Sequence, residues 1–151
     1  MGLFSNLRKG KVEPVDTTLA RAMLTMPVLA GAADGKFEES ETREIVTLCA
    51  QNAVFLRLGY DRTEALIKEI VIDMKKRGAQ AIFKEAVAVM PQEMRETALC
   101  FAVRVSAADG HVDKSEFEAL KVMGQTMMIP PERFIQIFEV LMMLHRAPRA
   151  A

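Results

Sequence analysis

The residues of this sequence that could do chemistry together are carboxylates, which recur in two short segments. Residues 32–41 read AADGKFEESE and residues 107–116 read AADGHVDKSE, so six of the ten positions are identical at an offset of 75. Both segments carry acidic residues in one register: Asp34, Glu38 and Glu41 in the first, and Asp109, Asp113 and Glu116 in the second. Carboxylate oxygens are preferred ligands of hard divalent cations. The doubled segment indicates an internal duplication.

One interpretation of these segments is a divalent-cation site. Their spacing matches the second half of an EF-hand loop, with Gly at the sixth position and Glu at the twelfth. The first and third ligand positions would fall on Ala30 and Ala32 in one copy and on Val105 and Ala107 in the other. None of these has a side-chain oxygen, so an EF-hand is excluded. A weak shared site remains open, in which carboxylates of both copies converge on Ca²⁺, Mg²⁺ or Mn²⁺.

The other interpretation is local structure alone. Gly35 and Gly110 can adopt the left-handed conformation that ends a helix without strain. Asp113 stands where an N-cap belongs, and Glu116 three residues later completes a capping-box spacing. Glu38 is a poorer cap at the equivalent position. Helix capping would therefore explain almost every shared residue without a ligand.

Helices on both sides of each segment must position these residues. Apolar periodicity and helix stop signals predict helices over about 16–34, 39–52, 61–78, 79–90, 91–108, 114–127 and 132–145. We expect Pro27 to kink or split the first helix, residues 53–58 to be a short apolar connector, and Asp61 with Glu64 to form a capping box. The predicted fold is all-α with about seven helices. Two pseudo-twofold-related helix–DG-turn–helix–helix units would be joined by the helix 79–90.

Composition limits the classes of function. Lys plus Arg equals Asp plus Glu at 20 each, so no global field favours nucleic acid. The two cysteines, Cys49 and Cys100, lie in apolar helical stretches, and we expect both to be buried thiols. The eleven methionines are scattered over helix faces, which indicates core filling. No apolar run reaches the roughly 20 residues needed to span a bilayer, and we expect a cytoplasmic protein.

Catalytic motifs are not found. The two histidines, His111 and His145, are 34 residues apart, and no GxSxG, HExxH or glycine-rich phosphate loop occurs. His111 should be a solvated turn residue, whereas His145 should lie near a helix C-terminus, where a cation is favoured. We therefore expect a non-enzymatic module with no catalytic residue.

The chain divides into residues 1–15, a short basic flexible tail, residues 16–147, a single helical domain, and residues 148–151, a second tail. In the first tail, Leu3, Phe4 and Leu7 stand next to three basic residues, which is a small interfacial-anchor pattern. Two interpretations remain open, weak membrane contact at the inner membrane face and a plain solvated tail.

The doubled A-D-G-x-apolar-x-x-x-E segment resembles the tellurite-resistance TerB-like family, over roughly residues 17–146. The resemblance implies a bundle of about seven helices whose halves are related by a pseudo-twofold axis. It also implies a role in bacterial tellurite and stress resistance through metal binding and a protein partner, membrane-associated in some members. The acidic residues that carry over are Asp34, Glu41, Asp109 and Glu116. Related DnaJ-like co-chaperones carry this domain beside a J domain, but no HPD tripeptide occurs here, so that activity is not implied.

Overall fold

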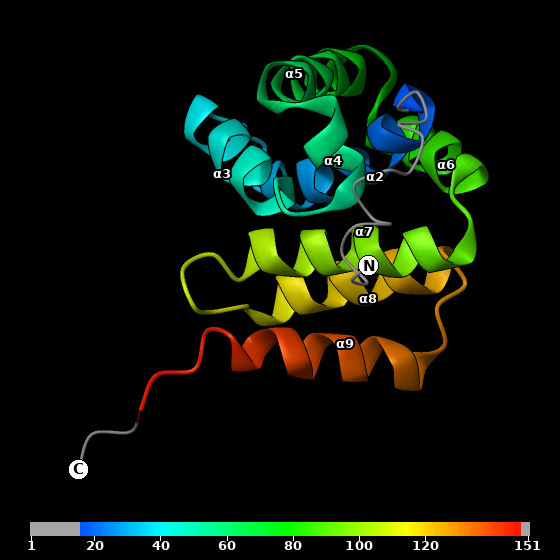
Figure 1. Ribbon diagram of the computed structural model, residues 1–151. Helices are drawn as coiled ribbons and strands as arrows, with labels where there is room; N and C mark the ends of the chain where they lie inside the picture. The colour runs from blue at the N-terminus through cyan, green and yellow to red at the C-terminus, as the bar shows by residue number, and fades with distance from the viewer. Residues whose placement is uncertain (1–15, 149–151) are drawn as a thin grey trace, which may run out of the picture.

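The computed structural model describes residues 16–148, which form eight α-helices and no strand (Figure 1). In chain order these are α2 (Thr17–Gly31), α3 (Glu39–Cys49), α4 (Ala53–Leu58), α5 (Tyr60–Arg77), α6 (Ala79–Val89), α7 (Gln92–Ser106), α8 (Lys114–Thr126) and α9 (Pro131–Met143). The predicted all-α class is confirmed, with one helix more than expected. The basic tail at residues 1–15, with its membrane-contact pattern, and residues 149–151 lie outside the described part of the chain.

The central element is α2, which packs most extensively against α7 and also contacts α5 and α6. Residues 22–28 of this helix are buried without interruption. A helix that is apolar on all sides is expected at the centre of a fold rather than at its surface. Pro27 lies within α2, which continues to Gly31, so the helix is not split.

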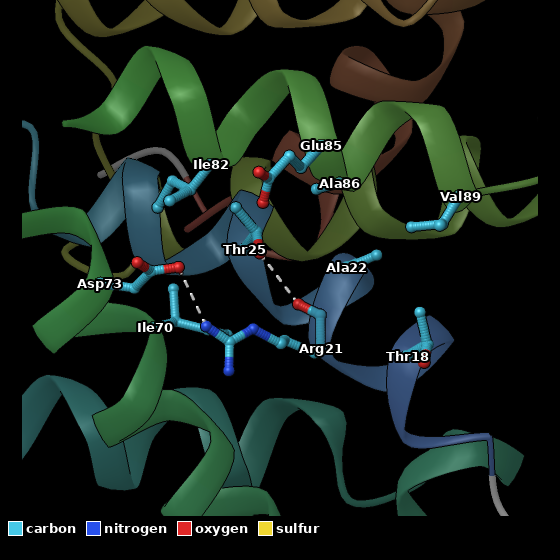
Figure 2. Close-up of a pocket in the computed structure, with 10 residues that line it drawn as sticks. All are labelled: Thr18, Arg21, Ala22, Thr25, Ile70, Asp73, Ile82, Glu85, Ala86 and Val89. Carbon is cyan, nitrogen blue, oxygen red and sulfur yellow. Dashed lines mark hydrogen bonds and ion pairs between the residues drawn. The ribbon is translucent and has the colours of Figure 1, made fainter. Parts of the chain in front are cut away.

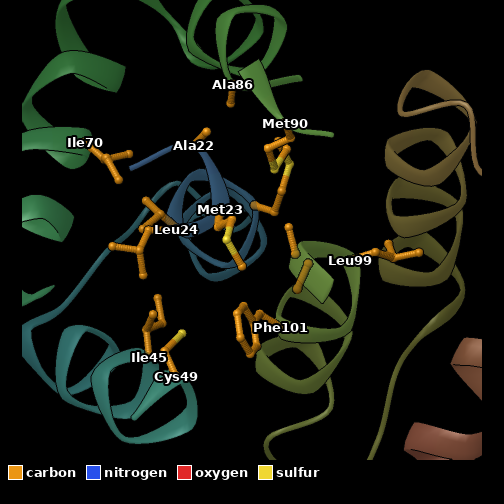
Figure 3. Packing of buried hydrophobic residues seen from close by; sticks show 14 of the residues in the cluster. Ala22, Met23, Leu24, Ile45, Cys49, Ile70, Ala86, Met90, Leu99 and Phe101 are labelled. Carbon is orange, nitrogen blue, oxygen red and sulfur yellow. The ribbon is translucent and has the colours of Figure 1, made fainter. Parts of the chain in front are cut away.

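The core surrounds α2 on several sides. Figure 3 shows Met23 and Leu24 on the central helix, with Ile45 and Ile70 approaching from α3 and α5, while Leu99 of α7 lies on the side that faces α8. All five side chains are essentially inaccessible to solvent. Four methionines are also part of the buried set, as expected for core filling: Met23, Met26, Met90 and Met127. Because α2 and α7 pack together, the turns that follow them are carried to one region of the molecule.

The second half of the chain forms a stack in which α8 and α9 both contact α7 (Figure 1). Phe117 of α8 lies edge-on to Phe134 and Phe138 of α9, with ring centroids 5.6 and 4.9 Å apart. Edge-to-face packing suits the charge distribution of aromatic rings. This aromatic cluster fixes α9 against α8.

The predicted connector at residues 53–58 is wrong, because this segment is the helix α4. Asn52 caps it by accepting a hydrogen bond from the backbone N–H of Val54 at 2.9 Å. Phe55 and Leu58 are buried against the core, so packing stabilises a helix of only six residues. The apolar run looked featureless in the sequence because it is too short to show a helical period.

The predicted capping box at Asp61 and Glu64 is also wrong. Gly59, at φ +86°, ends α4 and leads directly into α5, which begins at Tyr60. Asp61 is therefore already inside the helix, and Glu64 forms an i,i+4 ion pair with Lys68 at 3.1 Å. By contrast, Gly78 has φ +88° and ends α5 where the sequence predicts.

Within residues 16–148, no helix combines the length and the apolar character needed to cross a bilayer.

Candidate functional site

The two Asp-Gly turns have the same local geometry. Gly35 and Gly110 have φ of +84° and +83°, and each donates its backbone N–H to the carbonyl three residues earlier, at 2.9 and 2.8 Å. Asp34 Oδ1 accepts the N–H of Lys36, and Asp109 Oδ1 accepts the N–H of His111, both at 3.0 Å. The duplication seen in the sequence is thus a duplication of conformation, and left-handed glycine is the reason that both copies keep it.

The helices after the turns are capped in two different ways. In the second copy Asp113 Oδ1 accepts the N–H of Glu116 at 2.8 Å, as an N-cap side chain should. In the first copy Glu41 reaches back and accepts the N–H of Glu38 at 2.7 Å. Asp113 therefore caps its helix as predicted, but the reciprocal capping box is formed by Glu38 and Glu41, where the sequence predicted the poorer cap. The capping interpretation accounts for several of the motif acids.

Both turns open onto one cavity of about 440 Å³, although they lie 75 residues apart in the chain. We call it the acidic cavity and define it by the carboxylates that line it: Asp34, Glu41, Glu44, Asp109, Asp113 and Glu116. Five of the six predicted site residues are brought together here. Glu38 is not among the lining residues and is exposed outside the cavity.

Burial and close neighbours shift the pKa values of three carboxyl groups in the acidic cavity. Burial raises the pKa of Glu116 above its usual value, and the nearby Asp113 and Asp109 raise it further. Burial and the charge of Glu41 raise the pKa of Glu44 in the same way. The pKa of Asp113 is lowered instead, chiefly because it accepts the backbone N–H of Glu116. The cavity therefore holds mutually repelling charge, which a bound cation would relieve.

Glu44 is a lining residue that sequence reasoning missed. It has no counterpart in the second copy, where position 119 is Ala. The available signal was its place on α3, three residues after Glu41, which puts both side chains on one helix face.

The donor chemistry of the acidic cavity suits Ca²⁺, Mg²⁺ or Mn²⁺, but its geometry is not that of a formed ion site. Across residues 16–148, no group of three or more His, Cys, Asp or Glu side chains is placed so that it could hold a metal ion. Asp34, Asp109, Asp113 and Glu41 instead use carboxylate oxygens for the local hydrogen bonds described above. Ion binding would require these side chains to turn towards one another.

A second cavity, of about 200 Å³, lies where α2, α5 and α6 meet (Figure 2). Its charged groups are paired with one another. Arg21 donates to Asp73 at 3.1 Å, and Asp73 and Glu85 both bind Arg77. These contacts hold the pKa values of Asp73 and Glu85 below their usual range, with Arg77 as the main cause. Satisfied pairs of this kind tie helices together, and we do not assign this cavity a ligand.

An apolar groove of about 490 Å³ separates α8 from the C-terminal end of α2 and from α6. We define the apolar groove by six of its lining residues: Leu29, Met74, Phe83, Ala119, Val122 and Met123. Val122 is 58% exposed and marks its open side. An exposed apolar surface of this kind is typical of a place where another molecule packs.

The residues that could have suggested catalysis are not grouped. His111 is exposed in its turn, as expected, while His145 lies just beyond α9 and outside the acidic cavity. Cys49 is buried, and burial raises the pKa of its thiol to about 12; Cys100 is only half-buried.

The family model "Tellurite resistance protein TerB" matches residues 20–139, which is most of the chain. The chain belongs to the TerB family. The resemblance carried by the doubled acidic segment is thereby confirmed, and both segments lie inside the matched region of this TerB domain. No curated protein and no solved structure matches the chain.

Proposed function

We propose that this TerB domain is a non-catalytic module whose acidic cavity binds a divalent cation weakly, and that ion occupancy tunes binding to a protein partner. The main support for the proposal is that carboxylates from both acidic segments meet at one place. Carboxylates of two segments 75 residues apart line one cavity, where burial and, in addition, neighbouring carboxylates raise the pKa values of Glu44 and Glu116. A capping role alone needs no such convergence, since each cap acts within its own turn.

Binding should be weak, because the ligands are not held ready. Turning the carboxylates of Asp34 and Asp109 inward breaks their hydrogen bonds to the following turn residues. The cation gains less free energy than it would in a preformed loop. We expect a dissociation constant on the order of 10⁻⁴–10⁻³ M, the range of weak calcium sites.

The test is a pair of isosteric substitutions, Asp34→Asn and Asp109→Asn, made together. Asn keeps an oxygen for the turn hydrogen bond while removing the charge. The melting temperature of the wild type should rise with millimolar Ca²⁺, Mg²⁺ or Mn²⁺, because an ion that binds only the folded state stabilises it. The double variant should lose this rise without becoming less stable in chelator.

Asp61→Asn provides the matched control, because Asp61 is an exposed acid on α5 outside the cavity. It should keep the full cation-induced rise. A wild-type melting curve unmoved by any of the three ions at millimolar concentration would refute the cation site.

The alternative function is a plain protein-interaction scaffold in which the acidic residues are only caps. Two observations favour it: four of the acids already make local hydrogen bonds, and the apolar groove beside α8 offers a surface for a partner. Val122→Lys in that groove should weaken partner binding under either function. Only the cation proposal predicts that a chelator weakens it too.

The proposed partner is a protein, membrane-associated in the manner that the family resemblance implies, with the module acting from the cytoplasm in tellurite and stress resistance. We propose no nucleic-acid partner, since positive and negative residues are equal in number.

A further inference from the structure

A third groove, beside α3 and α7, has a chemistry opposite to that of the acidic cavity. Its volume is about 590 Å³, and its cationic or titratable donors are Arg43 of α3, Arg104 of α7 and His145. We call it the basic groove. Ser40 and Gln51 add neutral hydrogen-bonding groups to its lining. Side chains from three distant parts of the chain thus present donors to one space.

Arg104 Nε and His145 Nε2 are inaccessible to solvent, and residues 16–148 provide neither of them with a hydrogen-bond partner. A guanidinium group has hydrogen-bond donors and no acceptor, so the partner of Arg104 Nε must be an acceptor. A buried polar group left unpaired is costly, and most such groups in proteins find a partner. Both nitrogens are covered in the structure, so an acceptor in the basic groove would reach them only after the side chains of Arg104 and His145 turn towards it.

The fold itself does not require an arginine at position 104. Five residues that line the basic groove each have a counterpart 75 positions away that lines the apolar groove. The pairs are Arg104 and Leu29, Glu44 and Ala119, and Thr47 and Val122, together with two further apolar pairs. The two grooves therefore occupy equivalent places in the two units. The apolar groove shows that leucine is accommodated at this place in the duplicated unit. The polar lining of the basic groove thus points to a ligand rather than to packing.

Among residues 16–148, Glu44 provides the one carboxylate that lines the basic groove. Among the described residues it is ion-paired with neither Arg43 nor Arg104. It also lines the acidic cavity, where burial and the charge of Glu41 raise its pKa. Glu44 therefore stands at the border between the two spaces and leaves both arginines without an ion pair to it.

We propose that the basic groove binds an oxyanion between the side chains of Arg43, Arg104 and His145, which line it. Arginine presents several N–H groups in a planar fork that matches the oxygens of phosphate or carboxylate groups. The groove is larger than a free ion needs and has the size of a small-molecule site. The favoured ligand is thus a phosphate group carried on a larger molecule.

Titration of the whole chain with inorganic phosphate, phenyl phosphate and acetate tests this proposal, with affinity measured by calorimetry at constant ionic strength. We expect phosphates to bind and phenyl phosphate to bind more tightly than the free ion. Equal binding of both phosphates would overturn the part of the proposal that concerns a larger ligand. No heat with any of the three anions would overturn the proposal itself.

Arg104→Leu is the decisive variant, because it copies the residue at the equivalent position of the first unit and should fold. Its affinity for phenyl phosphate should fall at least about tenfold, the loss expected when a charged hydrogen bond is removed. Its melting temperature without anion should not decrease. Arg57→Leu, at an exposed position of α4, is the matched control and should bind as the wild type does.

Glu44→Gln distinguishes this site from the acidic cavity. Removing the negative charge should strengthen oxyanion binding while weakening any cation effect, since Glu44 lines both spaces. Unchanged phosphate affinity in Arg104→Leu would overturn the oxyanion site and leave the cation proposal standing.

Discussion

Replacing Gly110 with valine tests whether backbone conformation alone keeps glycine in the doubled turn. Gly110 has φ +83°, a region that side chains with a Cβ rarely adopt. A Cβ built there would meet nothing within 4 Å, so the cost is backbone strain rather than a clash. That strain is roughly 1–3 kcal/mol for a β-branched residue. About 0.4–1 kcal/mol is offset because the unfolded chain also loses freedom.

The net loss in free energy of unfolding should be on the order of 1–2 kcal/mol, which lowers the melting temperature by about 2–8 °C in a chain of this size. Calorimetry or thermal circular dichroism in the presence of a chelator measures it. Gly110→Asn is the matched control, because asparagine tolerates positive φ better than other residues do, and it should be less destabilised. Equal melting temperatures for the valine and asparagine variants would refute the strain argument.

Three further predictions concern helix ends and charge. Arg95 of α7 donates hydrogen bonds to the carbonyls of Val87, Met90 and Met127 at the C-terminal ends of α6 and α8. Arg95→Met should therefore lower the free energy of unfolding in urea by roughly 2–3 kcal/mol. An unchanged urea midpoint would contradict this. Met128 has φ +63° just after α8 and is 74% exposed, so Met128→Gly should raise the melting temperature, by about 2–4 °C if the strain relieved exceeds the cost of the freer unfolded chain by roughly 1 kcal/mol. The pKa of Glu116 is higher in the folded protein than in the unfolded chain. Between these two pKa values the folded protein binds more protons, and above both of them the charged Glu116 carboxylate lowers the stability of the fold. Glu116→Gln should therefore raise the melting temperature at pH 7 and have little effect below about pH 4, where the wild-type carboxyl is protonated; a stabilisation independent of pH would rule out this electrostatic cause.

Features that depend on a few consecutive residues could be predicted from the sequence. The left-handed glycines at 35 and 110 follow from Asp-Gly after an apolar helix, and the N-cap role of Asp113 follows from its spacing to Glu116. The errors were local too. The helix α4 is too short to show a period, and Gly59 starts α5 before Asp61 could act as its cap.

From the offset of 75 we also predict that residues 24–48 superpose on residues 99–123. It is supported by the matching turns and by the equivalent linings of the apolar and basic grooves. A least-squares superposition of an experimental structure would measure it.

By itself, the sequence determined that the chain is helical, that it contains a duplication, and that each copy has an acidic turn with a left-handed glycine. The helices and the turns can be recognised from residues close together in the chain, and the duplication from a direct comparison of two segments. Only the tertiary structure decided that five motif acids and Glu44 share one cavity while Glu38 lies outside it. It also placed Arg104, from the middle of the chain, beside His145, near its end, in a groove whose equivalent is apolar. The packing of α2 against α7 and the course of the chain after α9 set those neighbours, and helical periodicity carries no information about which distant faces meet.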